Sequence, residues 1–189
     1  MRFYFIILLL VSFGNTAFMP DGEKEEVIVW QKNRKLTWDD YQGKRQKRFA
    51  AASTVYSMYR HISKTPSGDI IATVKAYFYP KDSWKSSWID DALLAHEQKH
   101  FDIVELYARK LRKQLTQIKV RNEADAEQKL DSIHKIIDAE MDAFQDKYDD
   151  ETDYSMAHDP QISWIKKIDA AIDNLSAYQN PEVKLKTAF

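Results

Sequence analysis

The segment from residue 92 to 111, ALLAHEQKHFDIVELYARKL, contains His96, Glu97 and His100 in a His-Glu-x-x-His pattern. On an α-helix, side chains four positions apart lie about 5 to 6 Å from each other at their β-carbons, so both imidazoles can bind one zinc ion. Glu97 lies about 100° around the helix, where it can reach a metal-bound water without being a ligand. The pattern therefore predicts hydrolysis in which zinc activates a water molecule and Glu97 is the general base.

A chance arrangement of two histidines on an amphipathic helix is the alternative interpretation. With five histidines and ten glutamates in 189 residues, the pattern is expected roughly 0.007 times by chance in one chain. A real metal site is therefore favoured over a pair of partly exposed histidines.

Catalytic zinc sites usually have three protein ligands and one open position, so a third ligand is needed. If the motif helix and the next helix form an antiparallel hairpin through the link at residues 116–122, the segment from about residue 138 onward is level with the histidines. This segment and the turn after it offer four candidate ligands: Glu140, Asp149, Glu151 and His158. His134 and His61 are interpreted as packed residues of a helix and a strand.

Composition limits the function classes and the metal ligands. Acidic and basic residues nearly balance, with a formal net charge of −1, so a nucleic-acid partner is not indicated. The chain has no cysteine, which excludes disulfides, a lipid-anchoring cysteine and thiolate ligands. Any zinc site must therefore use histidine and carboxylate ligands.

The first residues, MRFYFIILLLVSFGNTAFMP, combine Arg2, an apolar run and a small-residue end. The run is too short to span a bilayer and has the layout of a secretory signal, with an uncleaved anchor as the less favoured alternative. We expect residues 1–20 to be a signal peptide and residues 21–189 to be one exported domain, periplasmic or secreted, with no stable membrane span after cleavage.

The order of elements predicts an α+β fold. Period-two and β-branched patterns predict a small antiparallel or mixed sheet from residues 26–30, 53–62 and 69–80. Three helices are predicted after the sheet. The first begins at a capping box at Ser87, the second covers about 123–147, and the third covers about 160–178. The metal motif lies on the first long helix.

Three segments together resemble a known family: LTWDDYQG (36–43), LLAHEQKHFDIVELYARKL (93–111) and YDDETDYSMAHDPQISW (148–164). The chain resembles, over about residues 26–172, exported bacterial proteins of the domain of unknown function 922, regarded as zinc-dependent proteases. That family carries a Tyr-Asp-x-x-Thr-x-His-Gly block. Here Tyr148, Asp149 and Thr152 match the block, whereas Tyr154 and Ser155 replace His and Gly.

The resemblance implies a zincin-like domain with zinc as cofactor and a peptide or protein as substrate. Because the family histidine is replaced, Asp149 is the favoured third ligand beside His96 and His100. Tyr154 is expected to donate a hydrogen bond to the developing oxyanion. Two other functions stay open: a non-enzymatic envelope interaction protein with an idle or structural metal site, and a metal-dependent amidase acting on cell-wall peptide.

Overall fold

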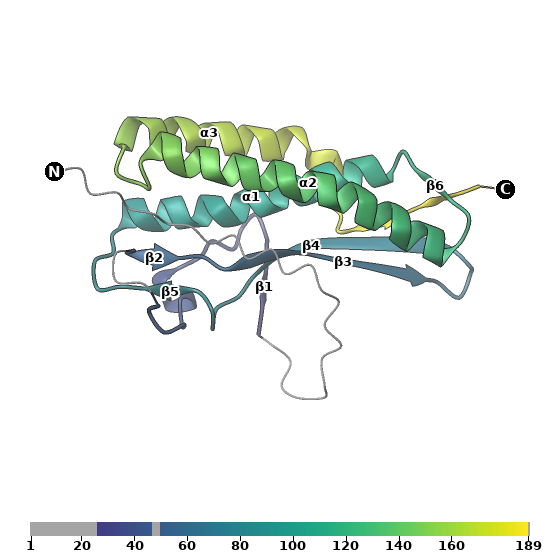
Figure 1. Cartoon of the computed structure of the whole chain (residues 1–189), viewed down its shortest axis with the longest axis horizontal. Coiled ribbons are helices and arrows are strands. Elements are labelled where there is room, and N and C mark those ends of the chain that lie inside the picture. Colours follow the sequence, from purple (N-terminus) through teal and green to yellow (C-terminus); the bar gives the residue numbers. More distant parts are fainter. Residues whose placement is uncertain (1–25, 47–49, 189) are drawn as a thin grey trace.

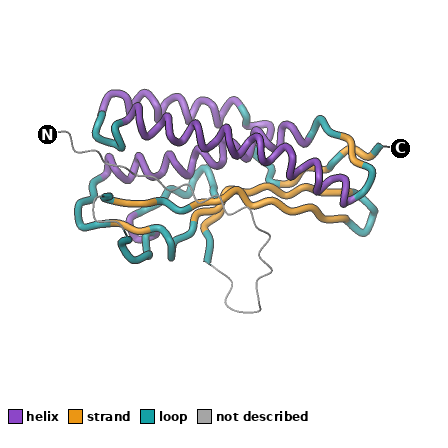
Figure 2. Tube along the Cα trace, viewed as in Figure 1, coloured by secondary structure: helices purple, strands orange, loops and turns teal. Residues whose placement is uncertain are grey.

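The computed structural model of the protein describes residues 26–46 and 50–188. Three helices lie on one face of a layer made of strands, and α1 (Asp91–Leu115) is between the strands and the other two helices (Figure 1). The same layers are seen when the chain is coloured by secondary structure (Figure 2). This arrangement confirms the predicted α+β class with three helices after the main strands. The predicted signal peptide, residues 1–20, lies outside the described residues.

The sheet is built around β4 (Ile70–Phe78), which alternates between buried and partly exposed residues as predicted. Its buried side chains face the helices: Ile70, Ala72, Val74, Ala76 and Phe78. β3 (Tyr56–Lys64) is antiparallel to β4 along its whole length. The turn between the two strands contains Gly68, whose φ of 91° is favourable only for glycine.

Short strands from both ends of the chain complete the sheet layer. β1 (Ile28–Val29) and β7 (Glu182–Lys184) pair with β4 on the edge opposite β3. Among the described residues, the outer edge of β3 has no strand partner. Two further pairs lie outside this sheet: β2 (Ala52–Ser53) with β5 (Trp84–Lys85), and β6 (Lys119–Val120) with β8 (Lys186–Thr187).

The central element of the fold is α1 (Asp91–Leu115), which contacts the sheet on one side and both other helices on the other. Most of its residues after Ala95 are buried, as expected for a helix enclosed by two layers. The Asp90 side chain caps its first turn by accepting a hydrogen bond from Leu93 N at 2.8 Å. The predicted start at Ser87 was wrong, because the true cap lies three residues later.

The second and third helices are α2 (Glu123–Thr152) and α3 (His158–Asn174). Asn122 caps α2, and the helix continues five residues beyond the predicted end. α3 stops before the predicted end and is followed by the 3₁₀ turn η2 (Ser176–Tyr178). Within the described part of the chain, no helix combines the length and apolar composition needed to cross a membrane.

A buried carboxylate, Asp102, fastens the segment that follows β1 to α1. Asp102 has no exposed surface, and its Oδ1 accepts hydrogen bonds from Trp30 Nε1 at 2.7 Å and from Gln98 Nε2 at 2.8 Å. Lys99 Nζ donates to its other oxygen at 2.8 Å. Gln98 Oε1 in turn accepts from Leu36 N at 2.7 Å. These bonds fix the N-terminal segment beside the residues that follow Glu97.

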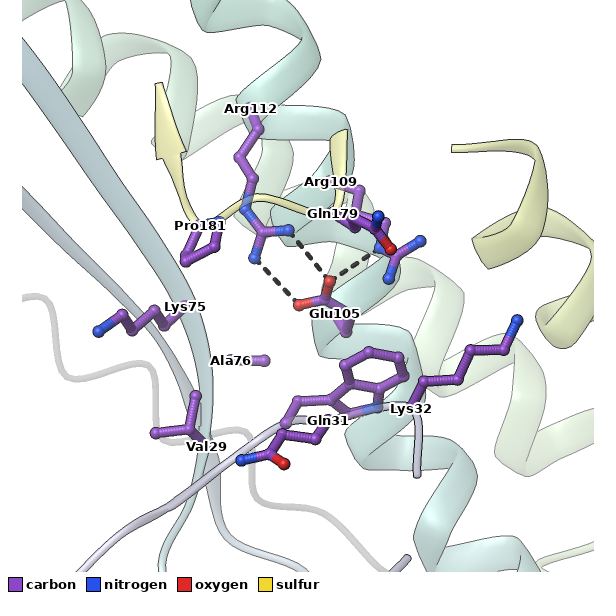
Figure 3. A pocket seen from close by; sticks show the side chains of 11 residues that line it. Val29, Gln31, Lys32, Lys75, Ala76, Glu105, Arg109, Arg112, Gln179 and Pro181 are labelled. Carbon is purple, nitrogen blue, oxygen red and sulfur yellow. Dashed lines mark hydrogen bonds and ion pairs between the residues drawn. The ribbon is translucent and has the colours of Figure 1, made fainter. Parts of the chain in front are cut away.

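A second buried ionic cluster lies farther along α1 (Figure 3). Glu105 accepts hydrogen bonds from Arg109 at 2.8 Å and from Arg112 at 3.0 Å. Arg112 also donates to the carbonyls of Val74 in β4 and Tyr178 in η2. The cluster forms one wall of a cavity of about 260 Å³ and joins the helix, the sheet and the C-terminal segment.

Candidate metal centre

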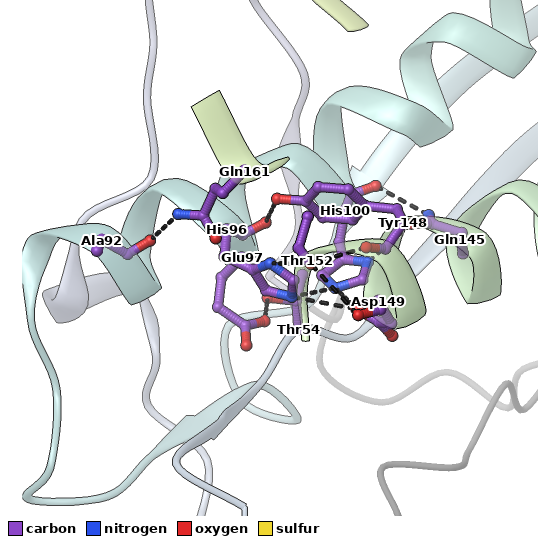
Figure 4. A network of polar contacts seen from close by, with 10 residues as sticks. All are labelled: Thr54, Ala92, His96, Glu97, His100, Gln145, Tyr148, Asp149, Thr152 and Gln161. Carbon is purple, nitrogen blue, oxygen red and sulfur yellow. Dashed lines mark hydrogen bonds and ion pairs between the residues drawn. The ribbon is translucent and has the colours of Figure 1, made fainter. Parts of the chain in front are cut away.

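Two helices bring three candidate metal ligands together. His96 and His100 lie one turn apart in α1, and their ring centroids are 4.8 Å apart. Asp149 lies in the last turns of α2, which packs against α1. The sequence placed Asp149 in a turn, but the helix continues through it. Asp149 therefore has a fixed helical position opposite the two imidazoles (Figure 4).

The three ligand atoms form a nearly equilateral triangle. His96 Nε2 lies 3.1 Å from His100 Nε2 and 3.1 Å from Asp149 Oδ1, and His100 Nε2 lies 3.0 Å from the same Oδ1. Ligand atoms about 2.0 Å from a tetrahedral zinc ion lie roughly 3.3 Å from each other. The triad can therefore hold a single metal ion with only small movements of the side chains.

Gln145 sets the tautomer of His100. Its amide Nε2 donates to the His100 carbonyl at 3.0 Å, which leaves its Oε1 as the acceptor for His100 Nδ1–H at 2.7 Å. With the proton on Nδ1, the neutral imidazole directs its Nε2 lone pair toward Asp149 and His96. Metal-binding histidines commonly have such an acceptor on the second ring nitrogen. Sequence analysis missed Gln145.

Two residues near the end of α2, Tyr148 and Thr152, fix the ring and the tautomer of His96. The ring of Tyr148 stacks on its imidazole with centroids 4.6 Å apart. Thr152 Oγ1 lies 3.5 Å from His96 Nδ1, a long contact. The threonine proton is used in a 2.7 Å bond to the Tyr148 carbonyl, so the proton in this contact is on the imidazole. His96 Nε2 therefore also presents its lone pair to the triad.

The electrostatics of the triad favour a positive charge at its centre. Burial lowers the pKa of His100, but the charge and hydrogen bond of Asp149 outweigh it and raise the pKa to about 9. Burial raises the pKa of Asp149, but His100 and His96 outweigh it and hold that pKa well below its usual value. A proton or a metal cation can supply this charge.

Glu97 lies beside the triad and is not part of it. Its side chain is only 5% exposed, and its Oε2 accepts a 2.5 Å hydrogen bond from Thr54 Oγ1. The negative charge of Glu97 also contributes to the raised pKa of His100, which places it close to the ligands. Sequence analysis missed Thr54, which lies between β2 and β3 and is 43 residues from Glu97.

The backbone N–H of Tyr154 donates to the Asp149 carbonyl at 3.0 Å, but among the described residues its side chain makes no hydrogen bond with a triad ligand. Tyr154 follows the end of α2, and burial together with the charge of Asp149 raises its pKa. The turn is unusual because Asp153, Tyr154 and Ser155 all have a positive φ, between 47° and 74°. Ser155, where the resemblance implies a glycine, has the highest of these values. Glycine adopts this left-handed conformation without strain.

The other candidate third ligands lie away from the triad. Glu140 is exposed on α2, and Glu151 accepts a hydrogen bond from Trp164 Nε1 at 2.8 Å. His158 is exposed at the start of α3 and lies 3.3 Å from Asp159. Of the four candidates from the sequence, only Asp149 joins His96 and His100.

Comparison with known proteins places the chain in one family. The family model of bacterial proteins of unknown function named DUF922 matches residues 33–159. The matched region contains the LTWDDYQG segment, the two histidines, Glu97 and Asp149. No curated protein and no solved structure gives a match. The chain therefore belongs to the DUF922 family of bacterial proteins of unknown function.

Proposed function

We propose that this protein is an exported zinc-dependent metalloprotease of zincin-like organisation, with the His-Glu-x-x-His motif on α1. The observation that carries the proposal is the triangle of His96, His100 and Asp149, whose ligand atoms lie 3.0 to 3.1 Å from each other beside a buried carboxylate. Two imidazoles and one carboxylate form a donor set that suits zinc and leaves one position open.

Zinc bound in this triad would supply a Lewis acid that lowers the pKa of a water molecule and polarises the peptide carbonyl. Glu97 then accepts the proton from the attacking water and transfers it to the leaving amine. One of its oxygens accepts from Thr54, and no hydrogen bond between described residues involves the other. Tyr154 is the proposed hydrogen-bond donor to the oxyanion.

The proposed substrate is a peptide or an unfolded protein segment. β3 begins two residues after Thr54, and its outer edge is free of strand partners within the described residues. A sheet edge can align an extended peptide through main-chain hydrogen bonds with little demand on its sequence. Export to the periplasm or the exterior rests on the signal-like residues 1–20.

Metal content is the first test. The chain without residues 1–20 should bind about one zinc ion per molecule, and His96→Ala should abolish this binding because a ligand is lost. His158→Ala is the matched control, since His158 is exposed and outside the triad, and it should retain the zinc. Equal zinc content in the parent and in His96→Ala would contradict the proposed centre.

Activity is the second test. The zinc-loaded protein should cleave unstructured peptides, and Glu97→Gln should retain zinc but reduce the rate by about 100-fold or more. Cleavage of cell-wall peptides alone would instead favour the amidase alternative. Glu97→Gln that cleaves at the parental rate would exclude Glu97 as the base.

A further inference from the structure

The Glu97 carboxylate is held from one side only. Thr54 Oγ1 donates to its Oε2 at 2.5 Å, within the range of a charge-assisted hydrogen bond. Thr54 belongs to the connection between β2 and β3, so the bond joins α1 to the sheet layer (Figure 4). The connection is itself fixed, because Val55 N donates to Ser83 Oγ at 2.9 Å.

A second hydroxyl group, that of Tyr41, forms a hydrogen bond with Thr54. Tyr41 Oη lies 2.8 Å from Thr54 Oγ1. A threonine hydroxyl has a single proton, and Thr54 gives it to Glu97, so Tyr41 must be the donor in this bond. Burial, followed by the charge of Glu97, raises the pKa of Tyr41 well above its usual value and keeps the hydroxyl protonated. The chain of donors therefore runs in one direction, from Tyr41 through Thr54 to Glu97.

The LTWDDYQG segment (36–43) fixes Tyr41. Its ring is only 4% exposed and packs against Trp38 and Phe78, with centroids 5.0 and 5.3 Å away. The preceding 3₁₀ turn, η1 (Trp38–Asp40), is closed by Asp40, whose carboxylate accepts from Thr37 N at 2.7 Å. Gly43 ends the segment where a β-carbon would lie 2.7 Å from the Lys81 carbonyl oxygen. The segment thus has a rigid position beside α1.

We propose that Tyr41 and Thr54 are positioning residues for the general base. They hold one oxygen of Glu97 and thereby direct the other toward the water that it deprotonates. This inference rests on the proposed hydrolytic function, and it gives the LTWDDYQG segment a role in the site. Among the described residues, Thr54 contacts no candidate metal ligand. Its replacement should therefore alter the position of Glu97 and leave metal binding unchanged.

Kinetics of the zinc-loaded protein test the role. Thr54→Val keeps the shape and removes the hydroxyl, so kcat should fall roughly 10-fold to 100-fold with KM and zinc content unchanged. Thr54→Ser restores the hydroxyl and should remain within about 3-fold of the parent, and Tyr41→Phe should lose roughly 3-fold to 10-fold. Tyr79→Phe is the matched control: it removes a tyrosine hydroxyl that is 2.8 Å from Ser57 Oγ and unconnected to Glu97. Parental kcat in Thr54→Val, or no rescue by serine, would overturn the inference.

Crystal structures separate this inference from the proposed function. In the parent, Glu97 should occupy one conformer bonded to Thr54, whereas in Thr54→Val it should leave that position or adopt several conformers. An unmoved Glu97 in Thr54→Val overturns the positioning role, whatever the activity. A parent that binds zinc but cleaves no peptide refutes the protease, while a displaced Glu97 in Thr54→Val still supports the positioning role.

Discussion

Gln145 holds His100 by two hydrogen bonds, one from each end of its amide: Nε2 donates to the His100 carbonyl and Oε1 accepts from His100 Nδ1. The glutamine is 2% exposed and is fixed in one orientation. An amide that binds both the ring and the backbone of the same histidine determines which ring nitrogen can bind a metal.

Gln145→Leu should therefore weaken zinc binding by about 10-fold to 100-fold, because His100 loses the group that fixes its ring and tautomer. Competition with a chromogenic chelator measures this change. Gln161→Leu is the matched control, because Gln161 is also buried but donates to the Ala92 carbonyl and contacts no ligand. Equal losses of affinity in the two variants would show that the effect is only a general loss of packing.

Zinc binding should release at least one proton, that of His100, at pH near 7.5. Without metal, His100 has a pKa of about 9, raised above its usual 6.5 mainly by Asp149 against the effect of burial. The stabilisation of the metal-free fold that corresponds to this raised pKa is fully present below pH about 6.5. It is lost as the pH rises through about 9. Because zinc needs the neutral imidazole, it must displace this proton.

Calorimetry in buffers of different ionisation enthalpy measures the proton release. The release should disappear above pH about 10, where His100 is already neutral. Proton uptake, or no exchange at pH near 7.5, would contradict the assignment of this charge to His100.

Ser155→Gly should stabilise the fold by about 0.5 to 1 kcal/mol. Ser155 has a φ of 74°, and a non-glycine residue in the left-handed region costs about 1 to 2 kcal/mol, partly offset by the greater freedom of glycine in the unfolded chain. Thermal unfolding measures the gain. Ser132→Gly, within α2, should instead destabilise by about 0.5 kcal/mol.

Arg112→Met should destabilise the protein by about 3 to 5 kcal/mol, because it leaves Glu105 buried with only Arg109 as a cation partner. Lys32→Met breaks the exposed ion pair with Asp173 and should cost less than about 1 kcal/mol. Denaturant unfolding of the two variants gives the comparison. Similar losses for both would show that the buried cluster contributes no more than a surface pair.

The sequence predicted the long elements of the fold and the short strand β1, and it missed the other short strands. The β3 and β4 hairpin and the three helices have clear periodicity over nine residues or more. β2, β5, β6, β7 and β8 have two or three residues each, too few to show a period, and each depends on a partner distant in the chain. The start of α1 was wrong because Ser87 and Asp90 are both acceptable caps, and only the structure shows which one is used.

The candidate site could likewise be predicted only in part. The spacing of His96 and His100 and the hairpin argument led to the two helices that carry the triad, and the resemblance selected Asp149, which lies beside both histidines. Gln145 could have been found, since it precedes Asp149 by four residues and so shares its face of α2. Thr54 could not, because a threonine in a loop has no pattern that links it to a glutamate 43 residues later.

The two halves of the candidate site depend on different layers of the fold. Glu97 is supported by the sheet side of α1, whereas His96 and His100 are completed by Asp149 from α2. A chain that has folded only its first half would carry the base and both imidazoles but would lack the carboxylate that completes the triad. The packing of α2 against α1 is therefore what brings the three candidate ligands of this protein together.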